Sequence, residues 1–189
     1  MNYVRGLAPW ICYGVLSLFD WRLAMGAAAV VALVLLVGQI RRFGADLLGT
    51  VTAVFFVVMT VIAVADPTSG LRFWPCALSN GTLAAVAFTS VALHRPFTLS
   101  FARAQVPEEI WNAPRFIQVN MVVSSAWAVA FAFGTIASAL IIGLADVNIL
   151  LLVVAQVIEF VGAVVFTRKY TGHVQRAAEQ QQRVAVPAA

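Results

Sequence analysis

Charge is scarce in this sequence, and its scarcity excludes most classes of soluble protein. Only 11% of the 189 residues are Asp, Glu, Lys or Arg, while 62% are hydrophobic. A globular domain usually carries about a quarter charged and half apolar residues. The net charge of +4 is spread between apolar runs, so we expect anionic lipid head groups, and no nucleic acid, as its counterpart.

Cysteine and histidine are almost absent, at two residues each. Cys12 and Cys76 show neither metal-ligand spacing nor a CxxC motif, so we expect two unpaired thiols. We find no nucleophile–base pair and no phosphate-binding glycine loop, and therefore expect no metal, no cofactor and no enzymatic activity. One alternative stays open, in which His94 acts with Glu108 and Glu109 as a metal site or in a lipid-modifying enzyme.

Long apolar runs are what the sequence has instead. A membrane-spanning helix needs about 20 such residues, and six runs predict an all-α, polytopic transmembrane bundle over residues 1–166. The expected spans are residues 7–19, 23–40, 47–65, 75–93, 116–144 and 149–166, followed by a polar tail over 167–189. The first run is short, with Pro9 expected in its first turns, so five spans are the alternative.

Lys and Arg are distributed unequally between the two sides that six spans would define. Ten of the twelve fall at the termini and in the loops after the second and fourth spans, whereas Arg22 and Arg72 fall on the other side. Cytoplasmic loops carry the excess of cations. We therefore expect both termini on the cytoplasmic side. With five spans only Arg5 changes side and the division is nine against three, so charge does not exclude that alternative.

Glu159 is an acid inside the sixth expected span, with Gln156 one helical turn before it. Ionisable residues at that depth usually face the helix bundle or a wet cavity. Glu159 is then either a proton or cation site, as in a small transporter or proton-coupled permease, or a hydrogen-bonded acid that joins helices.

The fifth span carries a stripe of residues at helical spacing. Its members are Asn120, Ser124, Trp127, Phe131, Thr135 and Ser138. A tight turn joins the fifth and sixth spans, so these helices should pack side by side. We expect Glu159 and Gln156 to meet this stripe.

The loop over 94–115 is the longest polar interruption between the spans. We expect a short interfacial helix over 97–105 and a second helix beginning at Pro107, where two acids follow. Trp111 would anchor the loop at the membrane surface. The residues expected to bind lipid phosphates or a partner protein are His94, Arg95, Arg103, Trp111 and Arg115.

Several stretches carry a resemblance to a known family. APWICYGVLSLFD, GQIRRFG, PCALSN, HRPFTLSFARAQVPEEIW and AWAVAF resemble small bacterial integral membrane proteins grouped with the intracellular septation protein A family. The resemblance covers most of residues 8–133. It implies a multi-pass protein of the bacterial cytoplasmic (inner) membrane that is involved in envelope growth or division. From the loop and the apolar spans we expect contacts with membrane lipids, with membrane-protein partners or with further copies of the same chain. It carries over no catalytic residue.

Overall fold

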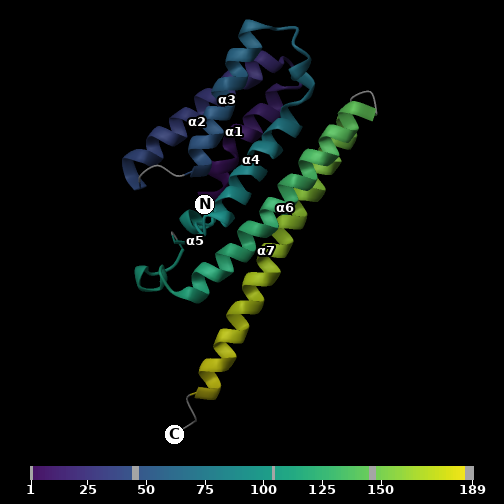
Figure 1. Cartoon of the computed structure of the whole chain (residues 1–189). Helices are drawn as coiled ribbons and strands as arrows, with labels where there is room; N and C mark the ends of the chain where they lie inside the picture. The colour runs from purple at the N-terminus through teal and green to yellow at the C-terminus, as the bar shows by residue number, and fades with distance from the viewer. Residues whose placement is uncertain (1, 44–46, 104, 145–147, 186–189) are drawn as a thin grey trace. The chain divides into compact units, whose positions relative to one another are not determined.

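The computed structural model describes residues 2–43, 47–103, 105–144 and 148–185. Within these ranges the chain is helical and contains no strand, which confirms the all-α prediction. The elements are α1 (Asn2–Leu16), α2 (Trp21–Phe43), α3 (Leu47–Ala65), the 3-10 helix η1 (Gly70–Phe73), α4 (Pro75–Ala92), α5 (Leu99–Arg103), the 3-10 helix η2 (Glu108–Ile110), α6 (Pro114–Leu144) and α7 (Ile149–Ala185) (Figure 1).

Five helices in the described ranges are long and apolar enough to cross a membrane. The qualifying segments are Trp21–Arg41, Leu47–Ala65, Pro75–Ala92, Pro114–Leu144 and Leu150–Ala178. The chain thus has the make-up of a multi-pass membrane protein. Six spans stay a prediction, because α1 has 15 residues and reaches only about 22 Å at 1.5 Å per residue.

Helix α1 differs from the span expected over residues 7–19. It begins at Asn2 and ends at Leu16, so Pro9 lies in the middle of the helix and not in its first turns. Proline has no N–H to donate to the carbonyl one turn earlier. Pro9 is buried, and the helix continues through it.

The chain divides into two compact units, an N-terminal one over Met1–Thr82 and a C-terminal one over Leu83–Ala189, with the boundary inside α4. In the N-terminal unit, α2 packs against both α1 and α3. Small residues of α2 let the helices approach closely around Phe56 of α3, which is fully buried. The Trp10 ring lies 4.7 Å and the Tyr13 ring 6.0 Å from that of Phe56. The core consists of Met25, Ala28, Ala29, Ala32, Ala53, Phe56 and Met59.

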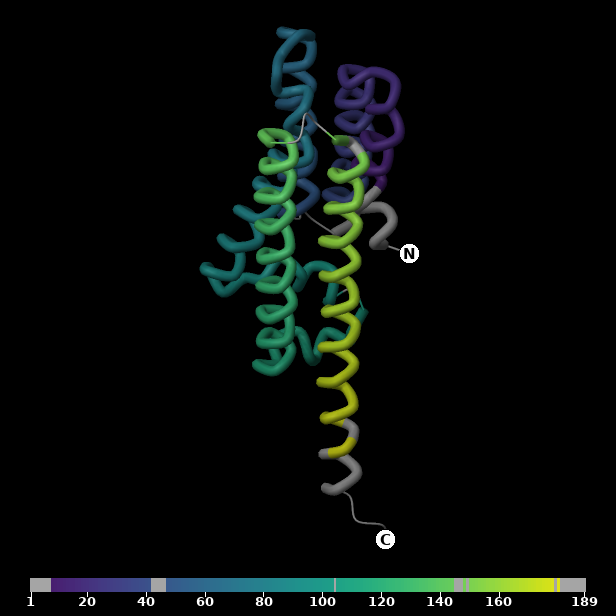
Figure 2. The backbone as a smooth tube through the Cα atoms, turned by 90° about the vertical axis from the view of Figure 1, so that its right-hand side faces the viewer, coloured from purple at the N-terminus to yellow at the C-terminus, as the bar shows by residue number. Residues whose placement is uncertain are grey.

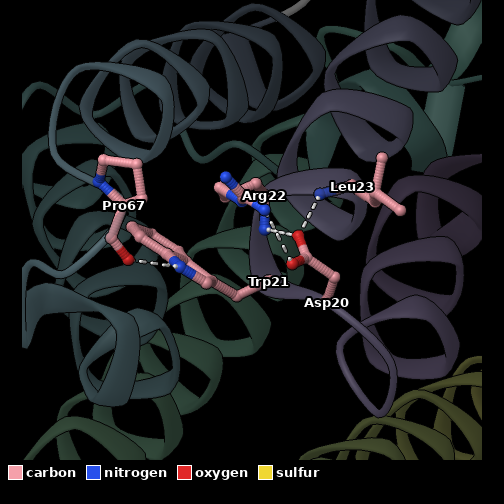
Figure 3. Close-up of polar contacts among 5 residues, drawn as sticks. All are labelled: Asp20, Trp21, Arg22, Leu23 and Pro67. Atoms are coloured by element: carbon pink, nitrogen blue, oxygen red, sulfur yellow. Dashed lines mark hydrogen bonds and ion pairs between the residues drawn. The ribbon is translucent and has the colours of Figure 1, made fainter.

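Two turns of the N-terminal unit are joined by one side chain. The indole Nε1 of Trp21 donates to the carbonyl of Pro67 at 3.2 Å, as Figure 3 shows. The α1–α2 turn and the α3–η1 turn therefore lie at the same end of this unit. This agrees with α1, α2 and α3 running alternately up and down.

Asp20 begins α2 as its N-cap. Its Oδ1 accepts the N–H of Arg22 at 2.8 Å and the N–H of Leu23 at 3.0 Å (Figure 3). The Leu23 N–H and the Arg22 guanidinium, 3.4 Å from Oδ2, hold the pKa of Asp20 below its usual value. An acid at a helix N-terminus satisfies donors that the helix leaves free.

In the C-terminal unit, α6 and α7 form an antiparallel pair. Trp127 joins them: its Nε1 donates to Thr167 Oγ1 at 3.1 Å, and its ring lies 5.6 Å from that of Phe160. Many apolar residues of α7 are exposed, such as Leu150 (70%) and Ile158 (59%). An apolar exposed face of this kind suits lipid as the solvent.

Helix α7 continues into the polar tail expected over 167–189. It runs without a break from Ile149 to Ala185, past the level at which α6 begins (Figure 2). The expected span over 149–166 and the described part of the tail therefore belong to one helix, and the place where the chain leaves the membrane stays a prediction. The polar residues beyond Thr167 extend the same helix because no proline interrupts them before Pro187.

Candidate functional site

The loop after α4 begins with a tight helix ending in which His94 takes a left-handed conformation, with φ of 54°. The Arg95 N–H donates to the Ser90 carbonyl at 2.9 Å, and the His94 N–H donates to the Val91 carbonyl at 2.9 Å. This pair of bonds is the Schellman motif, in which glycine is the usual left-handed residue. The structure thus gives His94 a role in ending the helix.

The chain then folds back over the end of α4. Pro96 is fully buried. Ser90 is buried as well, and its Oγ donates to the Ala87 carbonyl at 2.8 Å and accepts the Phe97 N–H at 3.3 Å. The first residues of the loop are therefore part of the packed structure.

Thr98 fixes the loop to α6. Its Oγ1 lies 3.0 Å from Asn120 Oδ1, 3.2 Å from the Asn120 carbonyl and 2.9 Å from Ser124 Oγ. The Thr98 N–H also donates to Ser124 Oγ at 3.4 Å. One hydroxyl has a single proton, so a consistent arrangement has Ser124 donate to Thr98 and Thr98 donate to Asn120. Asn120 Nδ2 in turn donates to the Phe116 carbonyl at 2.9 Å.

The middle of the loop is organised by Trp111. Its Nε1 is shared between the carbonyls of Arg103 at 3.1 Å and Val106 at 3.2 Å. The Arg103 guanidinium lies over the same indole, 5.6 Å from the ring centroid. Trp111 thus connects the end of α5 to η2, and both elements are shorter than the helices expected over 97–105 and from Pro107 onward.

The surface of the loop carries charge of both signs. Arg95, Glu108, Glu109 and Arg115 are exposed. Arg115, the second residue of α6, reaches α7, where its Nη2 lies 3.5 Å from the Val174 carbonyl. The loop can therefore meet a charged surface with its side chains while its backbone stays held by buried contacts.

Glu159 and Gln156 lie elsewhere in the C-terminal unit. Glu159 is only 8% exposed, on the α7 face that also buries Leu152 and Ala163. Trp127 and Thr167 set the register of the pair. From that level, Glu159 lies about 12 Å towards the α6–α7 turn, and Asn120 lies about 10 Å in the opposite direction.

The polar residues that we expected to meet are consequently separated into two places. Asn120 and Ser124 bind Thr98 of the loop and lie about 20 Å from the level of Glu159 along the helix pair. Only the Thr135 end of the stripe lies near that level, and a direct contact of Glu159 or Gln156 with it stays a prediction.

The contacts that Thr98 makes were not predicted from the sequence. A threonine in a loop is common, and nothing in the local sequence indicates that its partners lie 22 and 26 positions away. The available signal was on α6: Asn120 and Ser124 are one turn apart on an apolar helix, and buried polar groups need partners.

Cysteines and clusters of metal-ligating side chains are the remaining candidates for a chemical site. Cys12 and Cys76 form no disulfide within the described residues. Among the described residues, no three His, Cys, Asp or Glu side chains group in a way that could hold a metal ion.

Comparison with protein-family models, curated proteins and solved structures finds no match, so the resemblance to the septation family stays a prediction.

Proposed function

We propose that this protein is a non-enzymatic, multi-pass protein of the bacterial cytoplasmic membrane that supports envelope or septum maintenance. In this proposal the loop over 94–115 faces the cytoplasm and contacts anionic head groups and membrane-protein partners. The observation that carries it is the attachment of Thr98 to Asn120 and Ser124. That attachment fixes the loop to α6, so the exposed charged side chains of the loop have a defined position on this helix.

The proposal is tested by microscopy of a deletion strain that carries plasmid-borne variants at equal membrane levels. The loop variant combines Arg95→Ala and Arg115→Ala, and the control combines Arg168→Ala and Arg176→Ala, two exposed cations of α7. Both variants remove the same charge from the same expected side. We expect the wild type and the control to restore septa and cell shape, and the loop variant to fail. Rescue by both variants, or a deletion without any effect on septa or shape, would overturn the proposal.

A second candidate function has one specific observation in its favour, the burial of the Glu159 carboxyl within a membrane-length apolar helix. Such residues often mark ion or proton pathways. The candidate function is proton-coupled transport. It predicts a proton flux across liposomes, read with an enclosed pH-sensitive dye, that Glu159→Gln abolishes while folding is kept. Flux equal to that of empty liposomes, or unchanged by the substitution, removes this candidate.

A further inference from the structure

The side chains of Arg103 and Trp111 lie against each other in the middle of the loop. We propose that they bind the phosphate of a single anionic phospholipid head group. This inference rests on the proposed function and deepens it, because it names the chemistry that the loop recognises and the residue that recognises it.

Arg103 is the last residue of α5, and both its carbonyl and its guanidinium contact the same indole. The carbonyl accepts the Trp111 N–H at 3.1 Å, and the guanidinium lies 5.6 Å from the ring centroid. A second carbonyl, that of Val106, shares the N–H at 3.2 Å. The ring is therefore held in place before any ligand arrives, and it positions the cation.

The guanidinium has a donor without an acceptor. Arg103 Nε is buried and has no hydrogen-bond partner among the residues that the structure describes. No described carboxylate lies within ion-pair distance of it, in contrast to Arg22 beside Asp20. A buried donor that stays unpaired costs free energy, and more when it is charged. Arg103 as a whole is only partly buried, so an anionic acceptor from outside the described chain can approach the guanidinium, and it reaches Nε only if the side chain shifts on the indole.

Phosphate is the acceptor that fits this geometry. A guanidinium presents its N–H groups as a planar fork that matches phosphate oxygens, and it can do so while lying over an aromatic ring. Tryptophan is also enriched at membrane–water interfaces, and the neighbouring Ile110 is 42% exposed. A phospholipid supplies both parts, a phosphate for Arg103 and apolar chains for the indole and Ile110.

The two acidic residues of η2 disfavour binding of the loop to a broad anionic surface and favour binding of a single phosphate. Glu108 and Glu109 are exposed beside Trp111, and they repel a broad anionic surface. Adsorption through diffuse charge would therefore be weak here, whereas one phosphate in contact with Arg103 gains short, charge-assisted bonds. The site should hold one head group in preference to several.

The test is native mass spectrometry of the full-length protein in a neutral detergent, titrated with phosphatidylglycerol or phosphatidylcholine. We expect one bound phosphatidylglycerol in preference to phosphatidylcholine. Arg103→Ala should weaken this binding about ten-fold, the range expected for a charge-assisted hydrogen bond. Arg103→Lys should also weaken it, because lysine keeps the charge but lacks the fork. The matched control, Arg168→Ala on α7, should bind like the wild type, and unfolding midpoints establish that each variant is folded.

Three outcomes would overturn the inference: equal binding of the two lipids, equal weakening by Arg103→Ala and Arg168→Ala, or displacement of the lipid by millimolar inorganic phosphate. The last would show that the site takes free phosphate. These outcomes are separate from the microscopy test, since a loop variant can fail in cells through a protein partner even when lipid binding is absent.

Discussion

Thr98 Oγ1 and Asn120 Oδ1 lie 3.0 Å apart, although 22 positions separate the two residues in the sequence. This bond, together with Ser124, turns a polar loop and a polar patch on an apolar helix into one structure. Both partners on α6 are buried, so neither can exchange Thr98 for bulk water without local opening. The loop's position is therefore a property of the fold.

Replacing Thr98 with valine tests this directly, because valine keeps the shape and removes the hydroxyl. We expect Thr98→Val to lower the free energy of unfolding by about 1–3 kcal/mol, since Asn120 and Ser124 each lose a buried partner. Reversible unfolding in mixed micelles provides the measurement. Ser100→Ala is the control, because Ser100 is exposed and its hydroxyl bonds the local Phe97 carbonyl. Equal effects of the two substitutions would contradict this role of Thr98.

At His94 a substitution by glycine should raise the free energy of unfolding, in contrast to Thr98→Val. A left-handed conformation costs a residue with a Cβ about 1–2 kcal/mol relative to glycine, although glycine also loses more entropy on folding. We expect His94→Gly to raise the free energy of unfolding by about 0.5–1 kcal/mol, and His94→Val to lower it, since β-branched residues tolerate this conformation poorly. Destabilisation by glycine would mean that the imidazole, and not the backbone, is what matters at this position.

Trp111 should protect the backbone next to Arg103. Trypsin cleaves after arginine, and the carbonyl that it would attack at Arg103 accepts the Trp111 N–H. We expect Trp111→Phe to speed cleavage at this bond about five-fold or more, which corresponds to the loss of roughly 1 kcal/mol. Mass spectrometry of timed digests measures the rate. Trp74→Phe is the control, and the same acceleration in that variant would indicate a general loosening instead.

The lowered pKa of Asp20 predicts that its contribution to the stability of the fold depends on pH. Its folded pKa lies below the value of about 3.9 that an unfolded chain would show, so its charge stabilises the fold above that value, and the contribution disappears as the pH falls through the folded pKa. Asn caps helices as well as Asp, so Asp20→Asn removes mainly the charge. We expect the variant to be less stable than the wild type at neutral pH and equal to it in strong acid. A difference that does not change with pH would show that the charge contributes nothing.

The sequence predicted those parts of the fold that depend on local pattern. The apolar run over 47–65 matches α3 to the residue, and Pro75 begins α4 as expected, since apolar runs and prolines act locally. The first helix lies five residues earlier than expected at its start, because a run with few breakers has no sharp ends.

The candidate site was predictable only in outline. Asn120 and Ser124 were identified as polar residues that need partners, but their partner was assigned to α7 on the basis of the tight turn between the spans. Composition and spacing do not reveal that a loop folds back onto the start of α6. That arrangement depends on the ending of α4 at His94 and on the burial of Pro96, both of which are features of the folded chain.

The proposed function requires that the loop over 94–115 face the cytoplasm, and cysteine labelling measures this directly. The background replaces Cys12 and Cys76 with serine, and single cysteines are introduced by Ser100→Cys in the loop or Gly70→Cys in η1, two exposed positions. A membrane-impermeant maleimide is applied to intact spheroplasts and to inverted membrane vesicles. We predict that Ser100→Cys reacts only in inverted vesicles and Gly70→Cys only in spheroplasts. Labelling of Ser100→Cys from outside intact spheroplasts would contradict the account.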